Sequence, residues 1–309
     1  MKQLTHRPAL AVLLATQILA AVSHAVEIQP ATHMVGNMDP STADATAVTF
    51  AQQPARVGDR VAQTVEVELQ LNTSITQAEQ QAHESKNGMS RRQQRFVEVL
   101  EVVDGNVRRA HVTYPLSRTT STENDQPADE IVQPVEQRSY FVTREGSSLY
   151  VTDADGAIPS RDEFEIIVTS LQNLGRPNPL IKYLVGKFCI GDQLRLSRET
   201  AEQLMGLGGQ FGRVEEFVLE LKSVGEIEGK RCAVFSSSIK AVGEPTNPVR
   251  IHAFGQMAIQ IDTCRIVSAE ISGPMTMSIV EKTPQGDFQY SAQGTMRLAV
   301  KSVYGFAQQ

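Results

Sequence analysis

The stretch that decides the fold is FQYSAQGTMRLAVK, residues 288–301, near the C-terminus. Its residues alternate between a mostly apolar and a mostly polar class, and this period of two is typical of a β-strand with one dry and one wet face. A strand this long predicts an antiparallel sheet that is covered on one side. The apolar parity holds Phe288, Tyr290, Ala292, Gly294, Met296, Leu298 and Val300, and the polar parity holds Gln289, Ser291, Gln293, Thr295, Arg297 and Lys301.

Similar alternation predicts strands in much of the chain. It is clear from Val61 to Leu71, and Asp104-Gly105 and Glu145-Gly146 predict tight hairpin turns between further apolar runs. Gly294 within its strand predicts a bend or a bulge. Two polar stretches, 72–95 and 115–137, are expected to be exposed loops. The first allows at most a frayed helix. The remaining expected strands are 96–103, 107–114, 139–144, 148–152, 217–221, 232–239, 257–261, 266–271 and 275–280.

Two helices are expected in the middle of the chain. Ser160 and Glu163 form a capping box, apolar residues follow at spacings of three and four, and Gly175 ends the pattern. Ser197 caps a second, shorter helix that ends near residue 206. The predicted fold class is therefore α+β: a large twisted antiparallel β-sheet, with a half-barrel as one possible form, and a few helices packed on one face.

The N-terminus predicts export. Lys2, His6 and Arg7 precede an apolar run, and Ser23-His24-Ala25 supplies small residues for cleavage, so residues 1–25 are interpreted as a signal peptide. The alternative is a membrane anchor, but about 14 apolar residues span only ~21 Å of helix, short of a ~30 Å hydrocarbon core. The predicted location is periplasmic or extracellular, with no transmembrane span after signal removal.

Residues 26–56, rich in Ala, Thr, Gln and Pro, are expected to be a flexible leader, and 57–309 a single β-rich domain. Val57-Gly58-Asp59 resembles Ile190-Gly191-Asp192. This predicts two related halves, 57–156 and 190–309, joined by a helical segment at 160–189. The alternative is that strand–turn–strand sequences resemble one another by chance.

Composition excludes several function classes. Aromatic residues make up only 6%, there is no Trp, and the formal net charge is −6, which argues against carbohydrate platforms and nucleic-acid partners. Neither a Gly-x-Ser-x-Gly elbow nor a His-Glu-x-x-His pattern occurs. No cofactor is expected. Arg91, Arg92 and Arg95 form a basic cluster, interpreted as part of a solvated loop in preference to a contact with an anionic surface.

The dry face of the C-terminal strands suggests a lining for an apolar small molecule or lipid, because methionine is soft and adaptable. The alternative is an ordinary core packed by helix 160–175. The predicted function is an exported, non-enzymatic protein that binds an apolar ligand or an envelope partner. The alternatives are a secreted hydrolase with an unrecognised site and a structural envelope protein without a ligand. The candidate lining residues are Met275, Met277, Phe288, Tyr290, Met296 and Leu298.

Two further sites are considered. Pairing Phe235 with Ile261 in an antiparallel hairpin places Cys232 opposite Cys264, which predicts a disulfide; the alternative is three buried thiols. No metal site is expected, although Asp153, Asp155 and Asp162 fall at three positions of a calcium loop. The alternative for that segment is a polar turn before the helix.

Together, the signal peptide, the Val151-Thr152-Asp153-Ala154-Asp155-Gly156 turn before a capped helix, and the segment from Asn178-Pro179-Leu180 to Gly191-Asp192 resemble secreted bacterial proteins of unknown function. The expected architecture is also similar to the lipoprotein-carrier (LolA-like) half-barrel. That resemblance implies a lipid-holding function, and no motif residue carries it.

Overall fold

The computed structural model describes residues 47–77, 80–124, 126–127, 130–205, 213–243, 248–283 and 286–305. The expected signal peptide and most of the expected leader lie outside these residues. The described strands are β1 (Ala47–Thr49), β2 (Arg60–Gln77), β3 (Gln80–Val103), β4 (Asn106–Glu123), β5 (Gln126–Pro127), β6 (Ile131–Val132), β7 (Arg138–Glu145), β8 (Ser148–Asp153), β9 (Lys187–Cys189), β10 (Gln193–Arg195), β11 (Arg213–Ile227), β12 (Lys230–Val242), β13 (Val249–Gln260), β14 (Ile266–Thr283) and β15 (Gly286–Gly305). The described helices are α2 (Arg161–Leu171) and α3 (Arg198–Met205).

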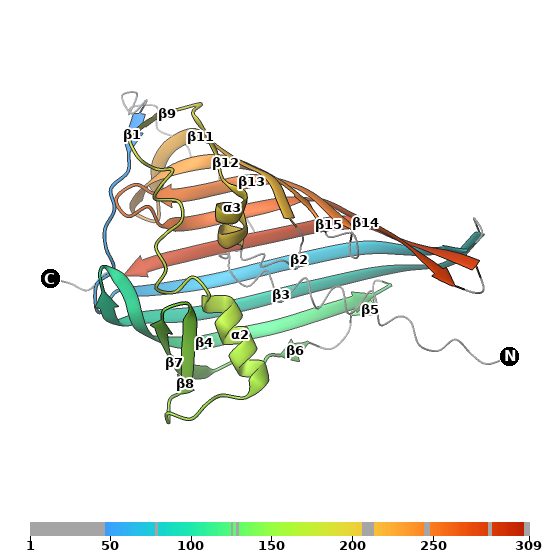
Figure 1. The fold of residues 1–309 in the computed structure, drawn as a ribbon, viewed down its shortest axis with the longest axis horizontal. Coiled ribbons are helices and arrows are strands. Elements are labelled where there is room, and N and C mark those ends of the chain that lie inside the picture. Colours follow the sequence, from blue (N-terminus) through green and yellow to red (C-terminus); the bar gives the residue numbers. More distant parts are fainter. Residues whose placement is uncertain are drawn as a thin grey trace.

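One large antiparallel sheet dominates the molecule (Figure 1). Its strand order is β10-β11-β12-β13-β14-β15-β2-β3-β4-β7-β8, with β5 and β6 paired to β4, and it is not closed into a barrel. Strands β1 and β9 form a separate two-stranded sheet. The large antiparallel sheet is as expected, but the fold is mostly β, so the predicted α+β balance is corrected.

The polar loop predicted at 72–95 is wrong, and the one predicted at 115–137 is wrong in part. Residues 72–77 end β2, and residues 80–95 form most of β3, which pairs with β2. Strand β4 continues to Glu123, and the short β5 and β6 follow it before a turn at 133–137. The physical reason is that a strand ladder is made by main-chain N–H and C=O groups, which pair whatever side chains they carry. Polar side chains on both faces therefore concealed these strands from an analysis of hydrophobic alternation. In Figure 1 the paired ends of β2, β3, β14 and β15 project beyond the rest of the sheet.

Local signals for turns and caps are confirmed. Asp104 and Gly105 both have positive φ, 51° and 77°, as the tight hairpin between β3 and β4 requires. Helix α2 has a complete capping box, in which the Ser160 side chain accepts from the Glu163 N–H and the Glu163 carboxylate accepts from the Ser160 N–H. Apolar packing then holds this helix on the sheet, where Ile167 contacts the same buried cluster as Val112.

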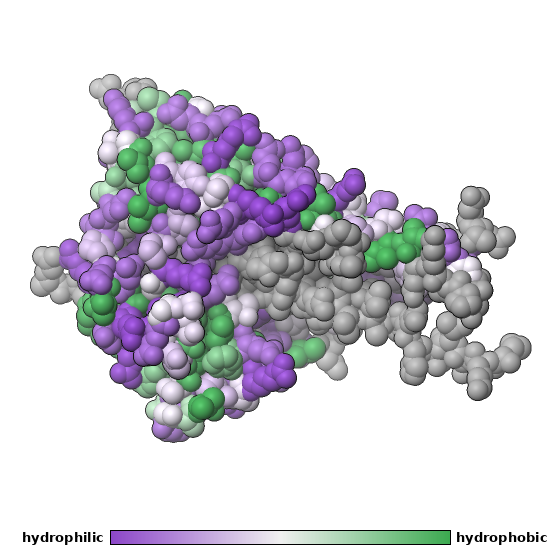
Figure 2. Space-filling view, viewed as in Figure 1, coloured by the Kyte–Doolittle hydropathy of each residue, from purple (hydrophilic) through white to green (hydrophobic). Residues whose placement is uncertain are grey.

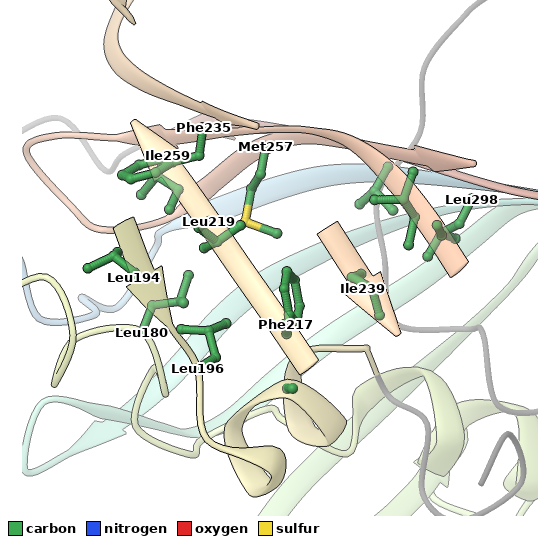
Figure 3. Packing of buried hydrophobic residues seen from close by; sticks show 14 of the residues in the cluster. Leu180, Leu194, Leu196, Phe217, Leu219, Phe235, Ile239, Met257, Ile259 and Leu298 are labelled. Carbon is green, nitrogen blue, oxygen red and sulfur yellow. The ribbon is translucent and has the colours of Figure 1, made fainter. Parts of the chain in front are cut away.

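We call the side of the sheet that carries its two largest buried clusters the inner face, and the opposite side the outer face. One cluster lies under α2 on β3, β4, β7 and β8. The other spans β11–β15 and β2, where α3, the segment 180–184 and β10 pack against it (Figure 3). In that view Leu180, Leu194 and Leu196 lie close to Phe217 and Leu219 of β11.

Three glycines let neighbouring strands approach closely. A Cβ atom would lie 1.7 Å from the Glu270 carbonyl oxygen at Gly255, and 1.7 Å from the Gln70 carbonyl oxygen at Gly294. At Gly273 it would lie 2.1 Å from a carbonyl oxygen of β13. Any side chain at these positions would clash, so glycine permits the close approach of the neighbouring strands. Gly294 pairs in continuous register with both neighbouring strands, so its predicted irregularity is a close approach and not a bulge.

The turns at Gly58-Asp59 and Gly191-Asp192 have the same geometry. The glycines have φ of 86° and 95°, and each glycine N–H donates to a carbonyl of the next strand over 2.8 Å, at Val99 and Leu221 respectively. Each Asp carboxylate accepts from the backbone N–H three residues earlier, over 3.0 Å at Asp59 and 2.8 Å at Asp192. This equivalence extends the similarity seen in the sequence. The duplication of 57–156 and 190–309 stays a prediction.

Candidate ligand-binding face

Five methionines gather on one face of adjacent strands, and we call them the methionine surface. Three are buried and two are partly buried, and all belong to or pack against one apolar cluster. The adjacent β2 adds leucines to the same cluster. A thioether side chain is unbranched and polarizable, so such a surface adapts its shape to an apolar partner. Its members are Met89 on β3, Met257 on β13, Met275 and Met277 on β14, and Met296 on β15.

The predicted lining residues are partly brought together here. Met275, Met296 and Leu298 are buried, and Met277 is partly buried against them. Phe288 and Tyr290 lie on the same parity of β15, toward its projecting end, where both are half-buried. Met89 and Met257 were not among the predicted lining residues, because 72–95 was expected to be a loop and the lining was drawn only from the strands at 275–280 and 288–301. The alternation of Met89 with polar neighbours was the available signal.

The strand register places these residues in rows across the sheet. One row runs Met89–Leu69–Met296–Gly273, from β3 through β2 and β15 to β14. The next row begins at Arg91 and continues with Val67, Leu298, Ile271, Gly255 and Ser237. A third begins at Gln93 and continues with Val65, Val300, Ala269, Met257 and Phe235. The inner face therefore changes from cationic and polar on β3 to apolar on β2, β15 and β14.

The basic cluster is not in a solvated loop, which corrects that interpretation. Arg91 and Arg95 point to the inner face and are buried, with 8% and 7% of their surface exposed. Arg92 lies between them in the sequence and has the opposite parity. It therefore points outward, where it forms an ion pair with Glu66 over 3.2 Å. Burial lowers the pKa of Arg91 to about 10; Tyr114 partly opposes this shift, and the charge of Arg95 adds to it.

Arg95 joins β3 to helix α2. Its Nη1 donates to the Ser170 carbonyl, and its Nε donates to Gln63 Oε1 over 2.7 Å. The hydroxyls of Tyr114 and Ser170 share a hydrogen bond of 2.6 Å. Burial lowers the pKa of Arg95 and raises the pKa of Tyr114. Because α2 carries no basic residue in its last turn, Arg95 supplies from the sheet the cation that helix carbonyls favour there.

Among the neutral side chains of the inner face, Gln93 Oε1 and Ser237 Oγ are buried atoms without a hydrogen-bond partner in the described part of the chain. Gln93 is 1% exposed, and its Nε2 donates to Ser117 Oγ over 3.1 Å. Ser237 is 4% exposed and lies on β12, at the other end of the row that begins with Arg91. Orphan polar atoms inside a protein cost free energy, and they mark places where water or a ligand completes the hydrogen bonding.

The outer face holds shallow hollows. One, of about 400 Å³, is lined by Phe96, Val303, His111 and the Arg60–Glu98 ion pair, among others. Another, of about 230 Å³, surrounds Gly88. On the side of the molecule that carries the helices, the described surface is mostly hydrophilic, with hydrophobic residues in small separate groups (Figure 2).

The predicted disulfide does not match the register. Strands β12 and β13 do form the expected hairpin, but Phe235 pairs with Met257, so Cys232 lies opposite Gln260. Cys264 follows the strand in a turn with a φ of 55°, and its thiol donates to the Ala51 carbonyl over 3.3 Å. Cys189, Cys232 and Cys264 are all free. Burial raises the pKa of the Cys232 thiol to about 11, so it stays protonated at neutral pH.

The segment considered as a calcium loop is a polar turn. Asp153 Oδ1 accepts from the N–H groups of Asp155 and Ala157 over 3.0 and 2.8 Å, and Asp162 lies in the first turn of α2. Across the described ranges, no group of three or more His, Cys, Asp or Glu is placed to hold a metal ion. Among the described histidines, His111 packs against Phe141, with ring centroids 5.1 Å apart, and His252 packs against Phe254 at 4.3 Å.

Comparison with known proteins gives no family. No protein-family model matches the chain, and no curated protein matches it. Among solved structures, the chain is similar to lipovitellin, with 11% identity and a TM-score of 0.39 over 82% of this chain. It spans only 26% of that lipovitellin chain.

Two other likenesses are weaker. A LolA superfamily protein from Nitrosomonas europaea matches with 9% identity and a TM-score of 0.15, over 79% of this chain and 87% of that one. The outer membrane protein OprG from Pseudomonas aeruginosa matches with 7% identity and a TM-score of 0.17, over 83% and 100%. At these scores the likenesses carry no functional argument. Among the described helices, neither is long and apolar enough to cross a membrane.

Proposed function

We propose that this protein is an exported, non-enzymatic protein that binds an apolar small molecule or lipid on the inner face of its sheet. The observation that carries the proposal is the methionine surface, five adaptable side chains on β3 and β13–β15, which with β2 are consecutive in an open sheet. The alternatives are a hydrolase and a structural envelope protein without a ligand.

The position of the helices supports the proposal. Helix α2 packs over the cluster on β3, β4, β7 and β8, and helix α3 contacts β11. Most of the methionines lie on β13–β15, between these two helix-covered parts of the sheet. The unpartnered atoms of Gln93 and Ser237 flank this region on β3 and β12. An apolar area with a few polar groups at its border is the usual composition of a small-molecule site.

Native mass spectrometry of protein purified from its own host's envelope tests the proposal. We expect a reproducible mass excess that disappears on solvent extraction. A bare mass would favour the structural alternative.

A tryptophan reporter locates the binding site, because the chain has no Trp of its own. Met277→Trp places the reporter on the inner face at a half-buried position, and Thr276→Trp places a control on the exposed outer face of the same strand. A brominated acyl chain is expected to quench the fluorescence of Met277→Trp and not that of Thr276→Trp. Equal quenching at both positions, or at neither, would contradict the assignment.

A further inference from the structure

We infer that the ligand of the methionine surface is an amphiphile with an anionic headgroup, and that Arg91 and Gln93 bind this headgroup at the β3 border. This inference rests on the proposed function and names the class of ligand. The two side chains are neighbours on one face of β3, about 7 Å apart along the strand.

The charges on the inner face are unevenly distributed. In the rows that begin at Met89, Arg91 and Gln93, every other inner-face residue from β2 to β12 is neutral. The carboxylates of Glu68 and Glu270, next to these rows, point to the outer face, where they pair with Arg297 over 3.3 and 2.8 Å. In these three rows the inner face is thus cationic at the β3 border and neutral elsewhere.

The second step separates the roles of the two buried arginines. The described hydrogen bonds of Arg95 go to the Ser170 carbonyl of α2 and to Gln63, so Arg95 is a structural link between helix and sheet. Arg91 lies two rows further along β3, beside the methionine surface. Its register neighbours are Val67 on β2 and Thr119 on β4. Arg91 is therefore the guanidinium placed to meet a headgroup.

The unpartnered atom of Gln93 is an independent observation. Rotating the amide by 180° retains the bond to Ser117, because a hydroxyl both donates and accepts, and turns the NH₂ group to the side where Oε1 lacks a partner. In that orientation Gln93 donates to a headgroup oxygen beside the Arg91 guanidinium. A carboxylate or phosphate oxygen accepts both donors, and charge-assisted bonds of this kind are the strong ones.

The acyl chain then follows the rows away from β3. From Arg91 the next inner-face residues are Val67, Leu298 and Ile271, and the adjacent row adds Leu69 and Met296. An uncharged apolar ligand would use this surface without the arginine. A free anion would use the arginine without this surface.

Calorimetric titration of the full chain with dodecanoate, 1-dodecanol and acetate, at pH 8 and below micelle concentrations, distinguishes these ligands. We expect dodecanoate to bind at least about tenfold more tightly than dodecanol, and acetate not to compete. Equal affinity for dodecanoate and dodecanol would overturn the inference and leave the proposed function standing. Binding of neither would overturn both, and competition by acetate would indicate a site for free anions.

Arg91→Gln and the matched control Arg92→Gln assign the effect to one residue. Arg91→Gln is expected to bring dodecanoate affinity down to that of dodecanol, whereas Arg92→Gln, on the outer face, leaves the preference unchanged. A preference that survives Arg91→Gln would overturn the inference. Where Arg91→Gln does not fold, Gln93→Leu serves instead, with a several-fold loss expected for dodecanoate alone; equal losses for both ligands would overturn the inference.

Discussion

Consecutive residues of β3 face opposite sides of the sheet, and the two sides differ in their electrostatic environment. Arg92 is half-exposed on the outer face and pairs with Glu66, whereas Arg91 and Arg95 are buried on the inner face beside neutral side chains. The outer pairing is worth little, because water screens it. At the buried inner positions, a change of charge, size or hydrogen bonding lowers the free energy of unfolding. The same substitution at neighbouring residues should therefore change stability by very different amounts.

The largest expected effect comes from the close approach of strands on the inner face. Gly294→Ala places a Cβ atom 1.7 Å from the Gln70 carbonyl oxygen, in the middle of the sheet. We expect a loss of about 3 kcal/mol or more in the free energy of unfolding, measured by urea titration. Gly225→Ala on β11 is the control, because a Cβ atom there meets nothing within 4 Å. Similar losses in the two variants would show that close approach is not the cause.

The second-largest expected effect is the difference in stability between substitutions at Arg95 and at Arg92. Arg95→Ala leaves the Ser170 carbonyl and Gln63 Oε1 without their buried donor, so we expect a loss of about 2–3 kcal/mol. Arg92→Ala removes an exposed pair and is expected to cost less than about 1 kcal/mol. Urea unfolding of both variants measures the difference. Equal costs would mean that burial does not distinguish the two faces.

Glu163, in the first turn of helix α2, makes the stability of the inner face depend on pH. Glu163 faces the sheet, and hydrogen bonds from Ser160 and Tyr140 and the charge of Arg138 lower its pKa to about 2, although burial alone would raise it. Because its folded-state pKa lies below that of the unfolded chain, the stability it contributes is complete above about pH 4.5 and is lost as the pH falls toward 2.

Between pH 7 and pH 3 we expect this carboxylate to account for about 1–2 kcal/mol of the lost stability, and Glu163→Gln to remove that part of the pH dependence. Urea midpoints at the two pH values give the measurement. Glu165→Gln is the control, because Glu165 forms an exposed pair with Arg161. A pH dependence that is the same in Glu163→Gln and in wild type would contradict the assignment.

The smallest effect concerns the two equivalent turns. Asp59 and Asp192 accept the same backbone hydrogen bond, but Asp59 is 4% exposed and also faces Arg265, whereas Asp192 is exposed. We expect Asp59→Ala to be about 1 kcal/mol more destabilising than Asp192→Ala, because Asp59 is buried and the substitution also removes its ion pair with Arg265. Thermal unfolding of the two variants tests this, and equal midpoints would show that burial adds nothing to the shared turn.

The local elements could be predicted from the sequence, because their signals lie within a few residues of one another. The alternation of residues 288–301 identified the longest C-terminal strand, Asp104-Gly105 identified a hairpin turn, and Ser160 with Glu163 identified the start of α2. These features depend on side-chain periodicity, positive φ and capping, which act between near neighbours. For the same reason, alternation in the sequence placed Met275, Met277, Met296 and Leu298 on one apolar face; that they line a ligand site stays a proposal.

Only the tertiary structure decided which side chains meet. Residues 72–95 form strands because β2, β3, β4 and β15 satisfy one another's main-chain groups, a long-range condition that polar side chains do not reveal. The register of β12 against β13 was displaced by four residues from the one expected, which separated Cys232 from Cys264. Arg91 and Gln93 are buried for the same reason. The surroundings of a strand in the middle of a sheet are set by the neighbouring strands and by whatever packs on the sheet, which can lie far away in the chain.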